Sequence, residues 1–132
     1  MAYWLLLADP KSYSFQDLMH DKTTVWDGIA GSIAQRRLHS FKPGDDVLVY
    51  HTSPDKAVVG HARVVSPPYP DPADATRKRV VVDLQAVAPL KRPVPLSAMR
   101  DNPSLSGMGF LKIQRIAVSP LSKAEFEEIL GQ

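Results

Sequence analysis

The sequence predicts an α+β domain, or a small β-barrel with short helices at its ends. Short apolar runs of strand length alternate with short stretches of helical periodicity. The 12 prolines cluster between these runs, and proline is excluded from central strands because it lacks an N–H group. Hydrophobic residues make up 44% of the 132 residues, enough for one packed core. We therefore expect a single domain over 1–132, with about five or six strands in mixed order.

The first third of the chain is predicted to alternate strands and helices. Residues 3–7 form an apolar run typical of a buried strand, and Ser14 is a suitable N-cap for a short helix to residue 20. Residues 23–26 are β-prone and should be extended. Apolar residues at 29, 33, 34 and 38 lie on one face of a helix predicted over 29–41.

The remainder is predicted to be mostly β-structure. Two strands, 46–52 and 57–65, are joined by a turn-like link and should form a hairpin. Alternating apolar residues predict a strand over 79–87, after a Pro- and Asp-rich loop, and a helical turn should follow over 95–100. Residues 110–118 are interpreted as further β-structure. A capping-box pattern at Ser122 and Glu125 predicts a terminal helix over 123–130.

Composition excludes several classes of function. The chain has no cysteine, which rules out disulfides, thiolate nucleophiles and thiolate metal sites. No run approaches the ~20 apolar residues of a membrane span, and the start lacks the features of a signal peptide, so we expect a cytoplasmic protein without a membrane partner. The four histidines show no metal-binding spacing, so neither a metal nor another cofactor is expected. A net charge of +2 permits a nucleic-acid partner without requiring one.

The end of the 46–52 strand is the most informative segment. Tyr50, His51 and Thr52 place a phenol, an imidazole and a hydroxyl side by side, which a strand does not need for stability. Upstream, Trp26 is followed by Gly28, which allows close backbone approach. Because strand side chains alternate, Tyr50 and His51 reach one pocket only if the strand bends or ends at His51. The alternatives are core roles for Trp26 and Tyr50 and turn-shaping or solvated roles for His51 and Thr52.

Several segments together resemble the EVE domain, a PUA-like family related to YTH and ASCH domains. They include Tyr3-Trp4-Leu5-Leu6, Asp9-Pro10, Tyr13-Ser14, Asp17-Leu18, Trp26-Asp27-Gly28-Ile29, Leu38, Lys42, Gly44-Asp45, Val47, Tyr50-His51-Thr52, Val58-Val59-Gly60-His61-Ala62, Tyr69-Pro70-Asp71-Pro72, Arg92-Pro93-Val94, Arg115-Ile116-Ala117-Val118 and Glu125-Phe126. The resemblance spans essentially the whole chain. It implies a curved β pseudo-barrel flanked by helices that binds nucleic acid and holds one base, often a modified one, in an aromatic-walled pocket.

The chain departs from the commonest family pattern in two places. Ala8-Asp9-Pro10 stands where many members have Ser-Glu-Pro, and residues 30–33 stand where many have Arg-Asn-Tyr-Gln. If those side chains contact the ligand in relatives, this chain binds a different base or binds more weakly.

The resulting hypothesis is a monomer that binds a single base of DNA or RNA without catalysis. Its base-binding residues would be Ala8, Asp9, Trp26, Gly28, Ile29, Tyr50, His51 and Thr52, and its phosphate-binding residues Arg36, Arg37, Lys112 and Arg115. Each cation alone, like the basic run 77–79, is more typical of a solvated surface charge, and only their location together on one face around the pocket would indicate a phosphate-binding surface.

Two alternatives remain. A PUA-like hydrolase acting on a modified base would need a pair such as Asp9 with Lys56 or His51. A protein-interaction module would present a flat apolar patch instead of a cleft.

Overall fold

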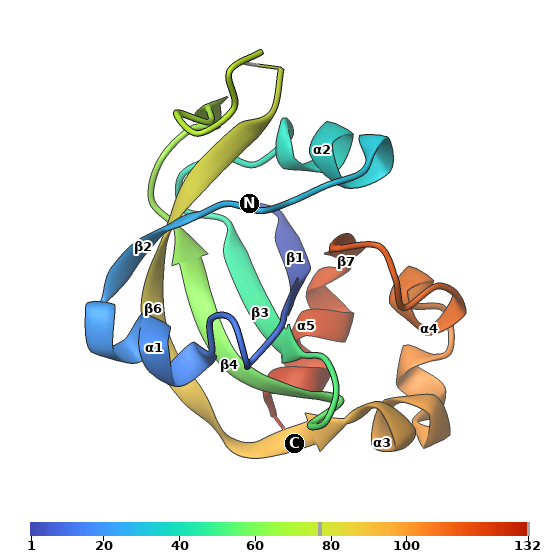
Figure 1. Ribbon diagram of the computed structural model, residues 1–132. Helices are drawn as coiled ribbons and strands as arrows, with labels where there is room; N and C mark the ends of the chain where they lie inside the picture. The colour runs from blue at the N-terminus through green and yellow to red at the C-terminus, as the bar shows by residue number, and fades with distance from the viewer. Residues whose placement is uncertain (77, 132) are drawn as a thin grey trace.

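The computed structural model describes residues 1–76 and 78–131 and shows a curved, mixed sheet with short helices on both of its faces (Figure 1). Six strands follow the order β2-β6-β4-β3-β1-β7, and β5 pairs with β6 beside this path. Only β1 and β3 are parallel among the described pairs. The strands are β1 (Tyr3–Ala8), β2 (Thr23–Trp26), β3 (Asp46–His51), β4 (Ala57–Val64), β5 (Tyr69–Pro70), β6 (Val80–Pro95) and β7 (Val118–Leu121). The predicted α+β class is confirmed, as is the β3–β4 hairpin.

Two hydrophobic clusters lie on opposite faces of the sheet. One cluster packs α1 and α2 against the face that carries Val47 and Val49. The other packs α3, α4, α5 and the 3-10 turn η1 against the face that carries Leu48 and Tyr50. Strand β3 therefore alternates between the two cores along its whole length. The helices are α1 (Phe15–Asp21), α2 (Ser32–Leu38), α3 (Leu96–Asp101), η1 (Pro103–Leu105), α4 (Gly109–Lys112) and α5 (Lys123–Leu130). None of these described helices is long and apolar enough to cross a membrane.

Capping boxes start two of the helices, at the predicted N-cap Ser14 and at the predicted capping box of Ser122 and Glu125. The Ser14 hydroxyl accepts from the Asp17 N–H at 3.1 Å, and the Asp17 carboxylate accepts from the Ser14 N–H at 2.9 Å. Ser122 and Glu125 make the same reciprocal pair at the start of α5. Each pair satisfies backbone donors that have no partner within the helix.

Three details of the sequence prediction are wrong. Helix α2 begins at Ser32 because Gly28 and Gly31 have φ of 74° and 93°, which keeps residues 28–31 out of the helix. Ile33 is 46% exposed and Leu130 is also exposed, so neither belongs to a packed face.

The third error concerns residues 110–118. Residues 109–112 form α4, and the side-chain amide of Gln114 donates to the Phe110 and Leu111 carbonyls of this helix. Strand structure begins only at Val118. Conversely, β6 runs to Pro95, past Pro89 and Pro93. Prolines are tolerated there because β2 pairs only with Val82–Gln85 and β5 only with Val80 and Val81, which leaves the part of β6 that carries Pro89 and Pro93 at an edge.

A buried carboxylate ties the start of the chain to the sheet. Asp45 is buried and accepts three hydrogen bonds, from the Ala2 N–H at 3.1 Å, the Trp4 indole N–H at 3.1 Å and the Lys42 N–H at 3.0 Å. Burial of a charge is tolerated when hydrogen bonds replace its water shell. Asp45 therefore helps to place β1 beside β3.

Substitution of Gly60 by alanine should destabilise the fold. A Cβ at Gly60 would clash with the ring of the buried Phe15, which lies over this point of β4. We expect a loss of about 1–3 kcal/mol in the free energy of unfolding, measured by urea denaturation, because the ring must leave its place. Gly107→Ala is the matched control, since a Cβ there meets nothing within 4 Å. Equal stability of the two variants would contradict this packing.

Alkaline pH should weaken the fold through Tyr69. Its hydroxyl donates to Asp83 at 2.7 Å, and this hydrogen bond, aided by burial, raises the pKa of Tyr69 from 10.0 to about 12. A raised pKa in the folded state stabilises the fold below pH 10.0, and this stabilisation is lost as the pH rises toward 12. Absorbance titration of the wild type and Tyr69→Phe should assign the late-ionising phenol to Tyr69. A Tyr69 that ionises near its ordinary value would contradict the bond.

Candidate functional site

A cavity of about 600 Å³ opens where the carboxyl end of β1 meets β2. This volume is within the range of small-molecule sites in proteins. Its walls come from β1, from the loop between β1 and α1, from β2 and the link that follows, and from one residue before β7. The lining residues are Leu7, Ala8, Asp9, Ser12, Tyr13, Thr24, Val25, Trp26, Asp27, Gly28, Ile29 and Ala117. A cleft is thus present where the protein-interaction hypothesis expected a flat patch.

Two aromatic side chains form adjacent walls of the cavity. The rings of Tyr13 and Trp26 meet edge to face, with centroids 6.2 Å apart and an interplanar angle of 80°. The Tyr13 hydroxyl donates to Asp21 at 2.7 Å, which fixes the orientation of the phenol. Burial, and then this hydrogen bond, raise the pKa of Tyr13, and the same bond lowers the pKa of Asp21. The Trp26 side chain is 8% exposed, so most of its area packs in the core while part of it faces the cavity.

The polar groups of the cavity include two carboxylates. Asp9 accepts from the Lys11 N–H at 3.0 Å and from the Ser12 hydroxyl at 3.3 Å, contacts that shape the loop. Asp27 is exposed beside Trp26, and its charge contributes to the raised pKa of Tyr69. Each carboxylate oxygen can accept more than one hydrogen bond. The cavity can therefore accept hydrogen bonds from an amine-bearing ligand.

Tyr50, His51 and Thr52 do not line the cavity. Tyr50 is 3% exposed and packs edge to face against Phe110, with ring centroids 4.8 Å apart, in the core on the other face of the sheet. Strand β3 ends at His51, as the prediction required, and its pairing with β4 is irregular between Val49 and Tyr50. The two side chains nevertheless stay apart, because Tyr50 packs in one core and the His51 ring contacts α1 on the other face. The core role considered for Tyr50 is the one that the structure shows.

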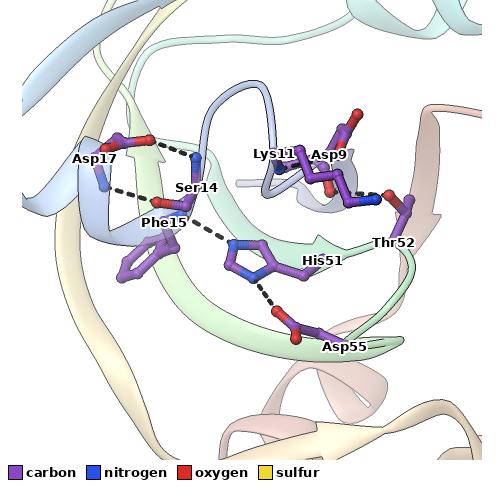
Figure 2. Close-up of polar contacts among 9 residues, drawn as sticks. Asp9, Lys11, Ser14, Phe15, Asp17, His51, Thr52 and Asp55 are labelled. Atoms are coloured by element: carbon purple, nitrogen blue, oxygen red, sulfur yellow. Dashed lines mark hydrogen bonds and ion pairs between the residues drawn. The ribbon is translucent and has the colours of Figure 1, made fainter.

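His51 is a buried structural histidine, 3% exposed (Figure 2). Its Nε2 accepts from the Phe15 N–H at 2.9 Å, and its Nδ1 lies 2.9 Å from a carboxylate oxygen of Asp55. Thr52 donates to the Ala8 carbonyl from its N–H at 2.9 Å and from its hydroxyl at 3.4 Å. These two residues therefore support the cavity loop without facing the cavity.

The four candidate phosphate-binding cations differ in their surroundings. Arg37 donates to the Val118 carbonyl at 2.7 Å, which joins α2 to β7. Arg36, Lys112 and Arg115 are exposed, and Arg115 lies two residues before Ala117 of the cavity. Of the basic run 77–79, Arg77 lies outside the described residues.

The pair of groups that the hydrolase hypothesis needs is not assembled among the described residues. Asp9 has no hydrogen bond or ion pair with Lys56 or His51, and the described lining includes neither lysine nor histidine. The His51–Asp55 pair lies outside the cavity. The described residues also contain no group of three or more potential metal ligands.

Sequence reasoning missed several lining residues, of which Ser12, Tyr13, Thr24 and Asp27 carry polar groups. The alternation of β2 could have found Thr24, because residues two apart share a face with Trp26. Asp27 lies between Trp26 and Gly28 and could have been included with them. Tyr13 precedes an N-cap and Ala117 precedes β7, and no local pattern marks either residue as part of a cavity.

Comparison with known proteins places the chain in one family. The EVE domain model matches residues 2–132. Thymocyte nuclear protein 1 of Gallus gallus is 27% identical over 98% of this chain and 67% of its own length.

Comparison with solved structures is consistent with this family match. A Rhodopseudomonas palustris protein has a TM-score of 0.94 at 32% identity, covering 99% of this chain and 92% of its own. The structure of human THYN1 protein in complex with DNA containing 5-methylcytosine has a TM-score of 0.88 at 25% identity. The match covers 99% of this chain and 96% of that chain. An ASCH protein of Zymomonas mobilis, 10% identical with a TM-score of 0.61, shares the fold. The chain belongs to the EVE domain family.

Proposed function

We propose that this chain binds nucleic acid by accommodating a single base in the cavity, without chemistry on the base. The observation that carries this proposal is the pair of aromatic walls, Tyr13 and Trp26, on a cavity that is large enough for a small ligand. A planar base stacked on an aromatic side chain gains about 1–3 kcal/mol. DNA containing 5-methylcytosine is the first ligand to test, because a structural relative has been solved with it.

The polar groups of the cavity suit a base that carries an exocyclic amine. The carboxylates of Asp9 and Asp27 are acceptors, as required by the N4 amine of cytosine. The Trp26 indole N–H has no hydrogen-bond partner among the described residues. Because every fully buried side-chain nitrogen among these residues does have a hydrogen-bond partner, the indole nitrogen cannot be fully buried and is accessible as a donor. Apolar side chains of Ile29 and Ala117 offer contact to a methyl group. We propose that Ala8 and Gly28 contribute through their backbones.

The roles proposed for the remaining candidates follow from their positions. Arg36, Lys112 and Arg115, all exposed, would hold phosphates of the flanking nucleotides. Arg37 would contribute mainly by holding α2 against β7. The cavity interior is acidic, so cations at its rim would be needed to offset repulsion of the phosphates.

Tryptophan fluorescence can test whether a base enters the cavity. The chain has two tryptophans, and Trp4 lies outside the cavity, stacked on Phe41. In Trp4→Phe, we expect a double-stranded oligonucleotide with one 5-methylcytosine to quench the remaining Trp26 emission. In Trp26→Phe, where Trp4 is the only fluorophore, the same oligonucleotide should cause little change. Unmodified DNA and the corresponding RNA complete the panel.

Trp26→Ala should lose about 1–3 kcal/mol of the free energy of binding to the 5-methylcytosine oligonucleotide. Titration calorimetry measures this loss on a variant whose fold is verified by circular dichroism. Equal affinity of wild type and Trp26→Ala, together with no quenching of Trp26, would refute base binding in this cavity.

The salt dependence of binding tests the phosphate contacts. Arg115→Ala and Arg36→Ala should each lower the slope of log affinity against log salt by about 1, with a similar loss for every DNA sequence, because each removes one phosphate contact. Lys123→Ala, on the first turn of α5 and away from the cavity lining, is the control. Slopes equal to the wild type in both arginine variants would remove these residues from the interface.

A further inference from the structure

We propose that His51 is a positioning residue for the cavity: its neutral imidazole holds the loop of residues 9–14 in place, and protonation of His51 releases that loop. The proposal rests on the proposed function, because the loop carries Asp9, Ser12 and Tyr13 of the cavity wall. It assigns the buried histidine an indirect role in ligand binding.

Two consecutive residues of β3 and its turn hold both ends of this loop. At the first end, Thr52 donates to the Ala8 carbonyl at 2.9 Å. At the second end, His51 accepts from the Phe15 N–H at 2.9 Å, at the first residue of α1 (Figure 2). The loop is thus fixed at both ends to residues that are adjacent in the chain.

The contacts of the imidazole define its tautomer. A backbone N–H only donates, so Nε2 must carry a lone pair toward Phe15. The Asp55 carboxylate only accepts when ionised, so the single proton belongs on Nδ1. A second proton on Nε2 would point at the Phe15 N–H, donor against donor. The imidazolium would keep its contact with Asp55 and lose its contact with α1.

Among the groups around His51, the Phe15 N–H is the contact that protonation of the ring would break. Asp55, on the same turn, is the charged group that contacts the ring. Asp17 on α1 accepts from the Ser14 N–H, and Asp9 on the loop after β1 accepts from Lys11 and Ser12. The Lys11 side chain extends toward Thr52 (Figure 2). The partner of His51 on β4 is the uncharged Ala57.

Movement of Phe15 would reach the cavity because its neighbours line it. The Phe15 ring is buried over Gly60, and Tyr13 lies two residues before it. Loss of the His51 contact frees the backbone between the loop and α1. Tyr13 stays bonded to Asp21 at the end of α1, so a displacement of α1 would carry the Tyr13 wall with it relative to Trp26.

Two isosteric substitutions separate this role from general stability. In His51→Gln the amide oxygen can occupy the place of Nε2 and accept from Phe15, and it cannot be protonated. In His51→Asn the amide reaches only the place of Nδ1, so the contact with Asp55 remains and that with Phe15 is lost. At about pH 8, where histidine is generally neutral, we expect His51→Gln to bind the 5-methylcytosine oligonucleotide like the wild type. His51→Asn should bind at least about tenfold more weakly.

The pH profile is the decisive measurement. Between about pH 8 and about pH 5, the range in which histidines take up a proton, wild-type affinity should fall more steeply than that of His51→Gln. His20, His39 and His61 are common to both proteins, so their titration cancels in the comparison. Parallel profiles of wild type and His51→Gln would overturn the proposal. This comparison also stands if His51→Asn does not fold.

Hydrogen exchange of the Phe15 amide provides a test that needs no ligand. At about pH 8 this amide should be protected in wild type and His51→Gln and unprotected in His51→Asn, with the amides of β3 unchanged. Equal protection in all three proteins would overturn the positioning role. If the protection pattern is as expected and no oligonucleotide binds the wild type, the proposed function fails while the role of His51 in holding the loop stands.

Discussion

The parallel pairing of β1 with β3 is the constraint on which the candidate site depends. Its register places Ala8 opposite His51, so the chain leaves β1 at the point where β3 also ends. The buried Asp45 carboxylate supports this pairing from the opposite end of the two strands. A shift of one residue in this register would exchange the two cores that β3 separates, and it would move the ends of both strands relative to each other.

The cavity lies where regular structure stops. The β1–α1 loop and the link after β2 supply half of its lining residues, and the sheet beneath holds both segments. Positive φ values at Gly28 and Gly31 keep the link out of α2 and so leave it beside the cavity. Loops can carry a specific site when a rigid scaffold positions them, and here both loops begin at strands of the same sheet.

The sequence was sufficient for most of the fold because its local signals agree with the packing. Ser14 and Ser122 start their helices, and the alternation in 46–52 follows the two cores. The prediction failed where contacts between distant parts of the chain determine the local structure. Residues 110–118 have apolar content suited to either structure, and the Gln114 contact with α4 cannot be read from a local pattern. Five of the predicted base-binding residues, Ala8, Asp9, Trp26, Gly28 and Ile29, line one cavity, and Tyr13 joins them through long-range geometry alone.

The Tyr50-His51-Thr52 segment shows why an unusual cluster of polar residues need not contact a ligand. Each of its polar side chains other than that of Tyr50 has a partner that belongs to the cavity loop or its supporting turn. The departures at residues 30–33 have a related consequence. Those residues line no part of the cavity, so their small size leaves its interior unchanged and removes long polar side chains from the link beside it. If side chains at these positions reach the ligand in relatives, then this chain must read a bound base with the polar side chains that line its own cavity, which are Asp9, Ser12, Tyr13, Thr24, Trp26 and Asp27.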